Sequence, residues 1–245
     1  MAKHVLEVVY EDDDLVAVNK PSGMLTLPDR HDGELESLRG LLVARYGQIF
    51  VVHRLDRDTS GLIVFAKNAA AHQYMSKLFE GRDINKYYLG LIMGKPLVNH
   101  GLIDAALAEH PAKNGSMVVH HKGKSSLTDY WVEEAFATMS LVKFQIHTGR
   151  THQIRVHAKH LGHPIVADGL YGDGKPVLIS SLKKKYKLSK TAEEEKPILN
   201  RLALHAFQLE FVNTKGEKQR LEAPLHKDMG ALLQQLRKLN GKGTV

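Results

Sequence analysis

The sequence predicts an α+β fold in a single domain, with a mixed, mainly antiparallel sheet flanked by helices. Short apolar runs bounded by Pro, Gly, Asn and Asp recur along the chain, and such runs are typical of strands. Other stretches carry leucines at three- and four-residue spacing, which is typical of amphipathic helices. The sequence contains no internal repeat and no clear linker, so one domain is expected over residues 1–245.

Composition limits the class of protein. Hydrophobic residues make up 43% and charged residues 25%, the profile of a soluble globular chain. No apolar run approaches the roughly 20 residues that a membrane helix needs, and the first residues lack the apolar core of a signal peptide. The chain has no cysteine, which excludes disulfides, zinc–thiolate sites and cysteine nucleophiles. We therefore expect a cytoplasmic protein without a membrane partner.

The charge balance favours a polyanionic partner. The formal net charge is +7, and Lys and Arg contacts to phosphate are the usual function of such an excess. The 15 histidines raise the alternative of a metal site, with His157 and His160 at i and i+3. However, no carboxylate accompanies them in the manner of a two-histidine zinc motif and their neighbours are cationic, so a metal site is not expected.

In the first quarter of the chain, two strands are predicted over residues 6–10 and 15–18, with an acidic turn between them. The loop Asn19-Lys20-Pro21-Ser22-Gly23 follows. The spacing leaves two roles open for Lys20, a phosphate contact or a surface lysine of a plain turn. A helix is predicted over residues 35–46, with Gly47 at its C-terminal end.

The next stretch concentrates charged side chains between two apolar runs, residues 50–52 and 62–66. It has the sequence His53-Arg54-Leu55-Asp56-Arg57-Asp58-Thr59-Ser60-Gly61. Two strands that hold a polar turn between them are a common support for a site. A solvated turn with only local hydrogen bonds is the other interpretation, and this stretch alone favours it.

Further elements follow in order. A helix with Asn68 as N-cap is predicted to end at Gly81, and a strand over residues 86–94 places Lys86 and Tyr88 on the same face. A tyrosine on a strand is usually a packing residue. A meander of short antiparallel strands is expected from the runs 102–107, 116–121, 127–135 and 140–146.

The segment from residue 147 to 162 is the second polar cluster. Thr151 is expected to be the N-cap of a helix that ends near Gly162 and carries Arg155 and Lys159 on one face. Basic side chains near free backbone amides, with Arg150 in the preceding loop, predict a site for a phosphate or for a carboxylate held elsewhere.

The C-terminal third begins with a charged loop or insertion at about residues 173–200. Its lysine-rich half (183–190) could contact a nucleic-acid backbone, although segregated charge is most often solvated. Strands at 202–212 and 217–222 then form a hairpin, and a final helix covers about 227–239.

Several of these segments resemble the motifs of the RluA-type RNA pseudouridine synthases. Residues 53–61 are similar to the family signature H-R-L-D-x-x-T-S-G, and 19–23 are similar to its N-K-P-x-G loop. Residues 86–88 resemble its K-x-Y strand, and 148–157 resemble T-G-R-x-H-Q-I-R-x-H. The resemblance continues in the same order through 162–168, 204–206 and 223–225, and covers about residues 8–230.

The resemblance implies a cofactor-free isomerase that converts particular uridines of structured RNA, ribosomal or transfer, to pseudouridine. It implies that Asp56 is the nucleophile, attacking either ribose C1′ or the uracil ring, and that the base is flipped out of its helix. Arg155 would pair with Asp56, and Tyr88 would stack on the uracil and help to remove the C5 proton, with Tyr87 as the alternative register. The expected RNA contacts are Lys20, Arg54, Arg150 and His152.

Many relatives carry an N-terminal S4-like RNA-binding domain, whereas the catalytic pattern begins almost at Met1 here. We therefore expect the catalytic domain alone to recognise RNA, as a monomer and without binding DNA. Two alternatives remain: a non-catalytic RNA-binding protein of the same fold, and a carboxylate-dependent glycosidase or nucleosidase. The glycosidase would normally need a second, well-placed carboxylate, and Asp58 is poorly placed for that role.

Overall fold

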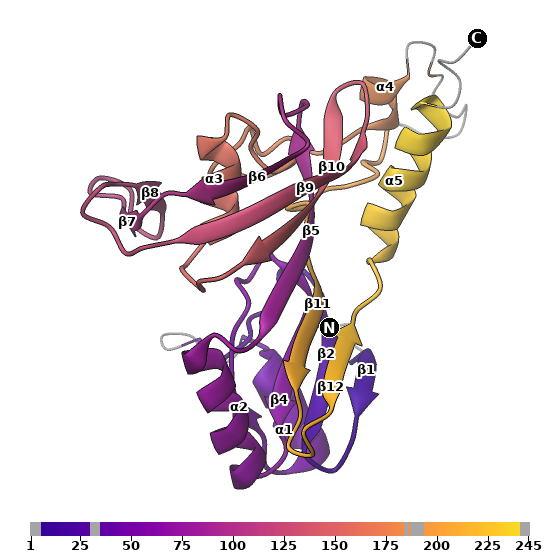
Figure 1. Cartoon of the computed structure of the whole chain (residues 1–245). Helices are drawn as coiled ribbons and strands as arrows, with labels where there is room; N and C mark the ends of the chain where they lie inside the picture. Colours follow the sequence, from indigo (N-terminus) through magenta and orange to yellow (C-terminus); the bar gives the residue numbers. More distant parts are fainter. Residues whose placement is uncertain (1–5, 30–34, 184–185, 187–193, 241–245) are drawn as a thin grey trace. The chain divides into compact units, whose positions relative to one another are not determined.

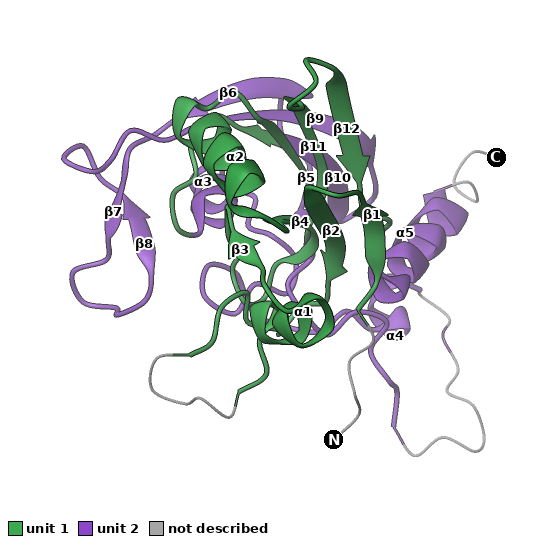
Figure 2. Ribbon diagram, turned by 90° about the horizontal axis from the view of Figure 1, so that it is seen from below, with its two compact units in different colours: residues 1–89, 145–151, 205–224 green, residues 90–144, 152–204, 225–245 purple. Residues whose placement is uncertain are grey.

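The computed structural model describes residues 6–29, 35–183, 186 and 194–240. The chain divides into two compact units, shown in green and purple in Figure 2. Unit 1 contains residues 1–89, 145–151 and 205–224, and unit 2 contains residues 90–144, 152–204 and 225–245. The predicted fold class is confirmed, because a mixed, mainly antiparallel sheet is combined with a few helices. The expectation of one domain over the whole chain stays a prediction.

Unit 1 is built on a sheet in which β1, β2, β4 and β11 are neighbours in that order (Figure 1). The short β3 pairs with β4, and β12 pairs with β11. The β4–β11 pair is parallel, and the pairs β1–β2, β2–β4, β3–β4 and β11–β12 are antiparallel. The strands are β1 (Val8–Glu11), β2 (Leu15–Lys20), β3 (Phe50–Val51), β4 (Ser60–Ala66), β11 (Leu204–Val212) and β12 (Lys218–Glu222).

The two central strands, β2 and β4, are buried along their whole length because both faces of the sheet are covered. Alternate residues of a strand point to opposite faces. Leu15 and Ala17 therefore join the core beneath helix α2 (Ala69–Gly81), whereas Val16 and Val18 join the core beneath helix α1 (Leu38–Tyr46). This double cover explains why β2 and β4 are continuous apolar runs rather than alternating ones.

Capping residues fix where both helices begin. The Asn68 side chain accepts a hydrogen bond from the backbone N–H of Ala71 at 2.8 Å, so the predicted N-cap of α2 is confirmed. The expected start of α1 at residue 35 is wrong, because Ser37 caps the helix and Leu38 is its first residue. Ser37 accepts the N–H of Gly40 at 3.2 Å. The leucine spacing continues beyond the capping residue, so the sequence pattern predicted a helix about one turn too long at its N-terminal end.

Unit 2 contains the neighbouring strands β10, β9 and β6, together with the two-stranded sheet β7–β8. The run 102–107 was expected to be one strand, but the structure divides it between β6 and β7. Strand β5 (Asn85–Met93) begins in unit 1 and continues in unit 2. The other strands are β6 (His100–Asp104), β7 (Leu107–Glu109), β8 (Met117–Val119), β9 (Leu127–Ala135) and β10 (Met139–Ile146).

The described part of unit 2 also contains the helices α3 (Gln153–His160), α4 (Ile179–Leu182) and α5 (Lys227–Asn240). The predicted C-terminal helix is confirmed, with Leu232, Leu233 and Leu236 buried on one face. The four-residue α4 lies inside the expected charged loop and is too short to leave a periodic pattern. Most of the predicted lysine-rich segment, 183–190, lies outside the described residues.

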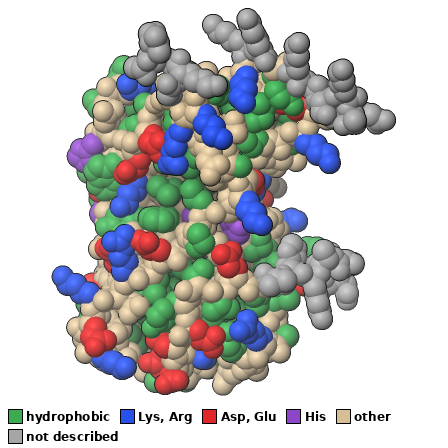
Figure 3. All heavy atoms as spheres, turned by 90° about the vertical axis from the view of Figure 1, so that its right-hand side faces the viewer, with side chains coloured by type: hydrophobic (Ala, Val, Ile, Leu, Met, Phe, Trp, Pro, Cys, Tyr) green, Lys and Arg blue, Asp and Glu red, His purple; other side chains and the backbone are tan. Residues whose placement is uncertain are grey.

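The surface distributes charge of both signs. On the face that Figure 3 shows, Lys and Arg side chains are interspersed with Asp and Glu side chains. The net charge of +7 is therefore not gathered into one basic field on that face. Within the described parts of the chain, no helix has the length and apolarity required to cross a membrane.

Candidate active site

Asp56 lies in the irregular segment that joins β3 to β4. The two strands pair in an antiparallel register, Phe50 with Ala66 and Val51 with Phe65, so the predicted turn between two strands is confirmed. Asp56 is half-buried, whereas its neighbour Asp58 is exposed. A carboxylate that is partly shielded on a rigid strand connection can be presented to a substrate without moving its support.

The loop of residues 20–26 fixes the backbone on both sides of Asp56. On the N-terminal side, the Thr26 hydroxyl donates to the carbonyl of Leu55 at 2.9 Å and accepts the N–H of Leu55 at 3.3 Å. On the C-terminal side, the Gly23 N–H donates to the carbonyl of Arg57 at 2.8 Å, and Arg57 Nε donates to the carbonyl of Gly23 at 3.0 Å. Asp56 is thus held between two residues whose backbones are already anchored.

Lys20 belongs to this brace and is not placed to contact RNA. Its side chain is fully buried, and its ammonium donates to the carbonyls of Pro21, Met24 and Arg57 at 3.1, 2.9 and 2.9 Å. The expectation of an RNA contact is therefore corrected, because an ammonium with no exposed surface cannot reach a phosphate. A buried charge is tolerated only when hydrogen bonds replace its hydration, and these carbonyls do so.

Replacing Lys20 with methionine should destabilise unit 1 by about 3 kcal/mol, because it removes a fully buried ammonium that donates to three carbonyls, one of them buried and two partly buried. Urea unfolding at neutral pH measures the effect. Lys77→Met on the exposed face of α2 is the matched control and should change stability by less than about 0.5 kcal/mol. Equal unfolding midpoints for the two variants would contradict the bracing role.

Tyr88, and not Tyr87, is the tyrosine beside Asp56. Burial, followed by the Asp56 carboxylate, raises the pKa of Tyr88 far above its ordinary value. Burial, followed by Glu210, raises the pKa of Tyr87, so the carboxylate near the Tyr87 hydroxyl is Glu210 and not Asp56. Because its phenol stays protonated at neutral pH, Tyr88 offers a ring face and an O–H donor rather than a phenolate base.

A cavity of ≈410 Å³ opens beside Tyr88 within unit 1. Arg54 and Arg150, both predicted from the sequence, line it with Tyr88, so the structure brings three of the predicted residues together. The remaining lining residues are Val52, His53, Phe79, Glu80, Arg82, Lys86, Ile146, His147, Thr148 and Gly149. Its cations outnumber its one carboxylate, which suits a phosphate-bearing ligand.

Two lining residues of this cavity were not recognised as site residues in the sequence. His53 stacks on Phe79 with ring centroids 4.6 Å apart, and its Nε2 accepts the N–H of Val64 at 3.0 Å. Burial and the nearby Lys86 lower the pKa of His53 to about 3, so its imidazole is neutral and supports the wall. Burial, followed by Arg82, also lowers the pKa of Lys86. Only tertiary neighbours reveal these environments.

Arg155 lies on α3 in unit 2 and forms a buried ion pair with Asp168. Its Nε and Nη2 donate to the two carboxylate oxygens of Asp168 at 2.8 and 2.7 Å. The two side chains are 3% and 0% exposed, and the guanidinium lies 5.1 Å from the centre of the Tyr171 ring. The sequence did not identify Asp168 as this partner. The expected pairing of Arg155 with Asp56 joins residues of different units and stays a prediction.

His152 precedes α3 and takes the N-cap position that was expected for Thr151. Its φ of 55° places it in the left-handed region, and its side chain does not cap the helix. Instead, its Nδ1 forms a hydrogen bond with the Tyr171 hydroxyl at 2.8 Å. The predicted cap at Thr151 is therefore wrong by one residue, and the RNA contact expected of His152 stays a prediction.

The Arg155–Asp168 pair predicts an acid-dependent loss of stability. Burial opposes ionisation of Asp168, but Arg155 and the N–H groups of Leu170 and Tyr171 outweigh it and lower the pKa. The contribution of the Asp168 carboxylate to stability is therefore fully present above its unfolded-state pKa of about 3.9. It is lost as the pH falls through the lowered pKa of the folded state. We expect Asp168→Asn to lower the free energy of unfolding by about 3 kcal/mol at pH 7. The variant should also show a weaker dependence of stability on pH below pH ~4.

Urea unfolding of wild type and variant at pH 7 and pH 3 measures this linkage. Asp228→Asn is the control, because Asp228 pairs with Arg201 while 35% of its side chain is exposed. A partly exposed pair should contribute at most about 1 kcal/mol. A loss at pH 7 no larger than that of the control would show that the buried pair adds little.

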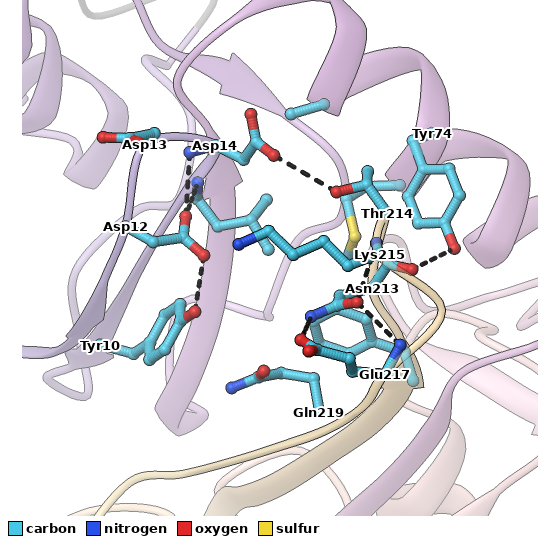
Figure 4. Close-up of a pocket in the computed structure, with 14 residues that line it drawn as sticks. Tyr10, Asp12, Asp13, Asp14, Tyr74, Asn213, Thr214, Lys215, Glu217 and Gln219 are labelled. Carbon is cyan, nitrogen blue, oxygen red and sulfur yellow. Dashed lines mark hydrogen bonds between the residues drawn. The ribbon is translucent and has the colours of Figure 1, made fainter.

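A second cavity of unit 1, ≈240 Å³, is acidic (Figure 4). Its described lining includes four carboxylates, of Asp12, Asp13, Asp14 and Glu217, and one cation, that of Lys215. Asp12 is engaged in turn structure, since its carboxylate accepts the N–H groups of Asp14 and Leu15 and the hydroxyl of Tyr10. The Asp12 hydrogen bond, with burial, raises the pKa of Tyr10 to about 12. The carboxylates of this cavity would repel a phosphate group.

No group of three or more His, Cys, Asp or Glu side chains in the described residues is arranged to hold a metal ion.

Comparison with known proteins gives the class. A family model described as RNA pseudouridylate synthase matches residues 14–160. The ribosomal large subunit pseudouridine synthase D of Nitrosomonas europaea is 35% identical over 96% of this chain and 66% of its own length. The protein of the same name from Xanthomonas campestris is 36% identical over 95% of this chain and 70% of its own. The chain thus spans about two thirds of the length of these curated relatives.

A solved structure has the same fold. The human RNA pseudouridylate synthase domain containing 4 has a TM-score of 0.72 and 25% sequence identity, and the match covers 94% of this chain and 93% of the human one. The chain belongs to the RNA pseudouridylate synthase family.

Proposed function

We propose that this protein converts specific uridines of structured RNA to pseudouridine, with Asp56 as the nucleophile. The observation that carries the proposal is the position of Asp56 on a braced strand connection, beside Tyr88 and a cavity lined by Arg54 and Arg150. Membership of the family supports the reaction class. The names of the relatives support ribosomal RNA of the large subunit as the substrate, rather than transfer RNA.

The reaction rearranges bonds without a co-reactant. The bond between ribose C1′ and N1 of uracil breaks, the base turns, and a bond forms between C1′ and C5 while the C5 proton is lost and N1 is protonated. The target base must leave its helix to reach a carboxylate on the protein. Asp56 attacks either C1′ or the uracil ring, and both routes give this same net exchange of bonds. Tyr88 would stack on the uracil, and Arg54 and Arg150 would hold flanking phosphates.

The proposal also gives a role to His152, as an RNA contact, and to Arg155, as the partner of Asp56. Arg155 would pair with Asp56 when RNA is bound, while Asp168 and Tyr171 keep its guanidinium in place. We further propose that the protein acts in the cytoplasm as a monomer and without a cofactor. The absence of cysteine in all 245 residues supports a reducing compartment.

Release of tritium from RNA that carries [5-³H]uridine tests this function, because the C5 proton must leave in every turnover. Transcripts of large-subunit rRNA, small-subunit rRNA and transfer RNA are compared with equal protein. We expect release from the large-subunit transcript, up to one equivalent for each target site. Binding without release from any of the three would favour a non-catalytic RNA-binding protein. Release from transfer RNA alone would overturn the substrate class.

A further inference from the structure

Unit 2 contains a cavity of its own, between the β7–β8 hairpin and α3. Its volume is ≈420 Å³, within the range of about 300–1,000 Å³ that is usual for ligand sites. Its floor is apolar, since Leu107, Val156 and Tyr171 form a small core there. Met117, Val119 and Leu170 pack against that core and complete the wall.

The rim of this cavity is basic. The cavity is lined by Lys113 from the hairpin loop, by Lys159 and His160 from α3, and by His110. Among the residues that the structure describes, no carboxylate lines it. Both lysines are exposed, as is His160. The acidic cavity of unit 1 (Figure 4) has the opposite character, with four carboxylates against one lysine. An apolar floor beneath a basic rim suits a ligand that is both flat and anionic.

Hydrogen bonds within the protein organise the wall of this cavity. The Tyr171 hydroxyl accepts the N–H of Met117 at 2.8 Å and bonds His152 Nδ1 at 2.8 Å, so it ties the hairpin to the start of α3. In the loop of the hairpin, Lys113 Nζ donates at 3.3 Å to the carbonyl of Leu170, which lies in the segment between α3 and α4. Contacts from α3 to β8 hold the helix against the hairpin. A preformed site loses little conformational entropy when it is filled.

We propose that this cavity binds an unstacked nucleotide of the RNA other than the target uridine. The base packs on Met117 and Val119 and against the imidazole of His160, and its phosphates contact Lys113 and Lys159. The inference rests on the proposed function, because it assumes an RNA substrate. An acidic protein segment is the other anion that a basic rim could take, but it would make no use of a flat apolar wall.

The lysine contacts are tested by the double variant Lys113→Glu/Lys159→Glu, prepared in the Asp56→Asn background so that binding is measured without turnover. Lys95→Glu in the same background is the control, since Lys95 is exposed in unit 2 and does not line the cavity. We expect the Kd for the substrate transcript to rise at least about tenfold, and the slope of log Kd against log salt to fall by about 2. Binding equal to that of Lys95→Glu would overturn the proposal.

The base contact is tested by placing p-benzoylphenylalanine at position 118, which lines the cavity, and irradiating the complex with RNA. We expect one main cross-link, to a nucleotide that is not the modified uridine, and its loss when single-stranded oligouridylate competes. If an acidic peptide prevents the cross-link and oligouridylate does not, the cavity binds a protein partner, and the nucleotide proposal is overturned. Cross-links spread evenly over the RNA would also contradict a defined site.

These results separate the two proposals. If wild type releases tritium while the double variant binds RNA as the control does, only the cavity proposal fails. If no RNA supports tritium release, the proposed function fails, and the binding difference still reports on the cavity.

Discussion

Asp56→Asn is expected to reduce tritium release from substrate RNA by at least about 10³-fold, while RNA binding changes little. Asparagine keeps the shape of the side chain but removes the negative charge that makes it a nucleophile. The brace around Leu55 and Arg57 consists of backbone atoms with Lys20, Gly23 and Thr26, so it should survive the change. Single-turnover release at saturating protein measures the chemical step directly.

Asp58→Asn is the matched control, because Asp58 lies two residues away on the same loop and is exposed. Its backbone carbonyl accepts the Ser22 hydroxyl at 2.6 Å, and the substitution leaves that contact unchanged. We expect near wild-type release from this variant. Equal losses in the two variants would indicate a general effect of loop charge, and a larger loss in Asp58→Asn would transfer the nucleophile to the other aspartate.

Gly61→Ala is expected to lower the free energy of unfolding by more than about 4 kcal/mol or to prevent folding. Gly61 has a φ of 112° and lies opposite Ala206 in the parallel β4–β11 pair. A Cβ at this position would lie 2.1 Å from the carbonyl oxygen of Ala206 and 2.7 Å from its nitrogen. Both are backbone atoms of a central strand, so relief requires the two strands to separate at the point where the segment that carries Asp56 ends.

Gly216→Ala separates this clash from backbone strain alone. Gly216 also has a positive φ, 80°, but no atom lies within 4 Å of the Cβ that alanine would add. It should cost only about 1–2 kcal/mol, the usual penalty for a left-handed alanine. Urea unfolding and the yield of soluble protein compare the two variants. A Gly61→Ala protein as stable as Gly216→Ala would contradict the close approach of β4 and β11.

Local patterns in the sequence predicted most of the elements, because these depend on residues near one another in the chain. Apolar runs located β2 and β4, Asn68 located the start of α2, and leucine spacing located α5. The predictions were wrong where the same local pattern is compatible with two different structures. Leucine spacing extended α1 beyond its cap at Ser37, and a continuous apolar run concealed the break between β6 and β7.

The site was harder to predict, because its environments depend on distant residues. A lysine between Asn and Pro has the same sequence pattern whether it is exposed or, like Lys20, bound by carbonyls as far away as Arg57. The fold brings Arg155 and Asp168 into contact, although no rule of sequence spacing predicts that they pair. The motif resemblance did select Asp56, Tyr88, Arg54 and Arg150, and the structure places the last three around one cavity. The burial and the ion pairs of these residues could be determined only from the three-dimensional structure.

Pseudouridine mapping in cellular RNA tests the central claim most directly. A strain without this gene is complemented with wild type or Asp56→Asn, and pseudouridine is located at single-nucleotide resolution in ribosomal and transfer RNA. We predict that one or a few pseudouridines of large-subunit rRNA disappear in the deletion strain, return with wild type and stay absent with Asp56→Asn. Restoration by Asp56→Asn, or an unchanged pseudouridine map in the deletion strain, would contradict the account.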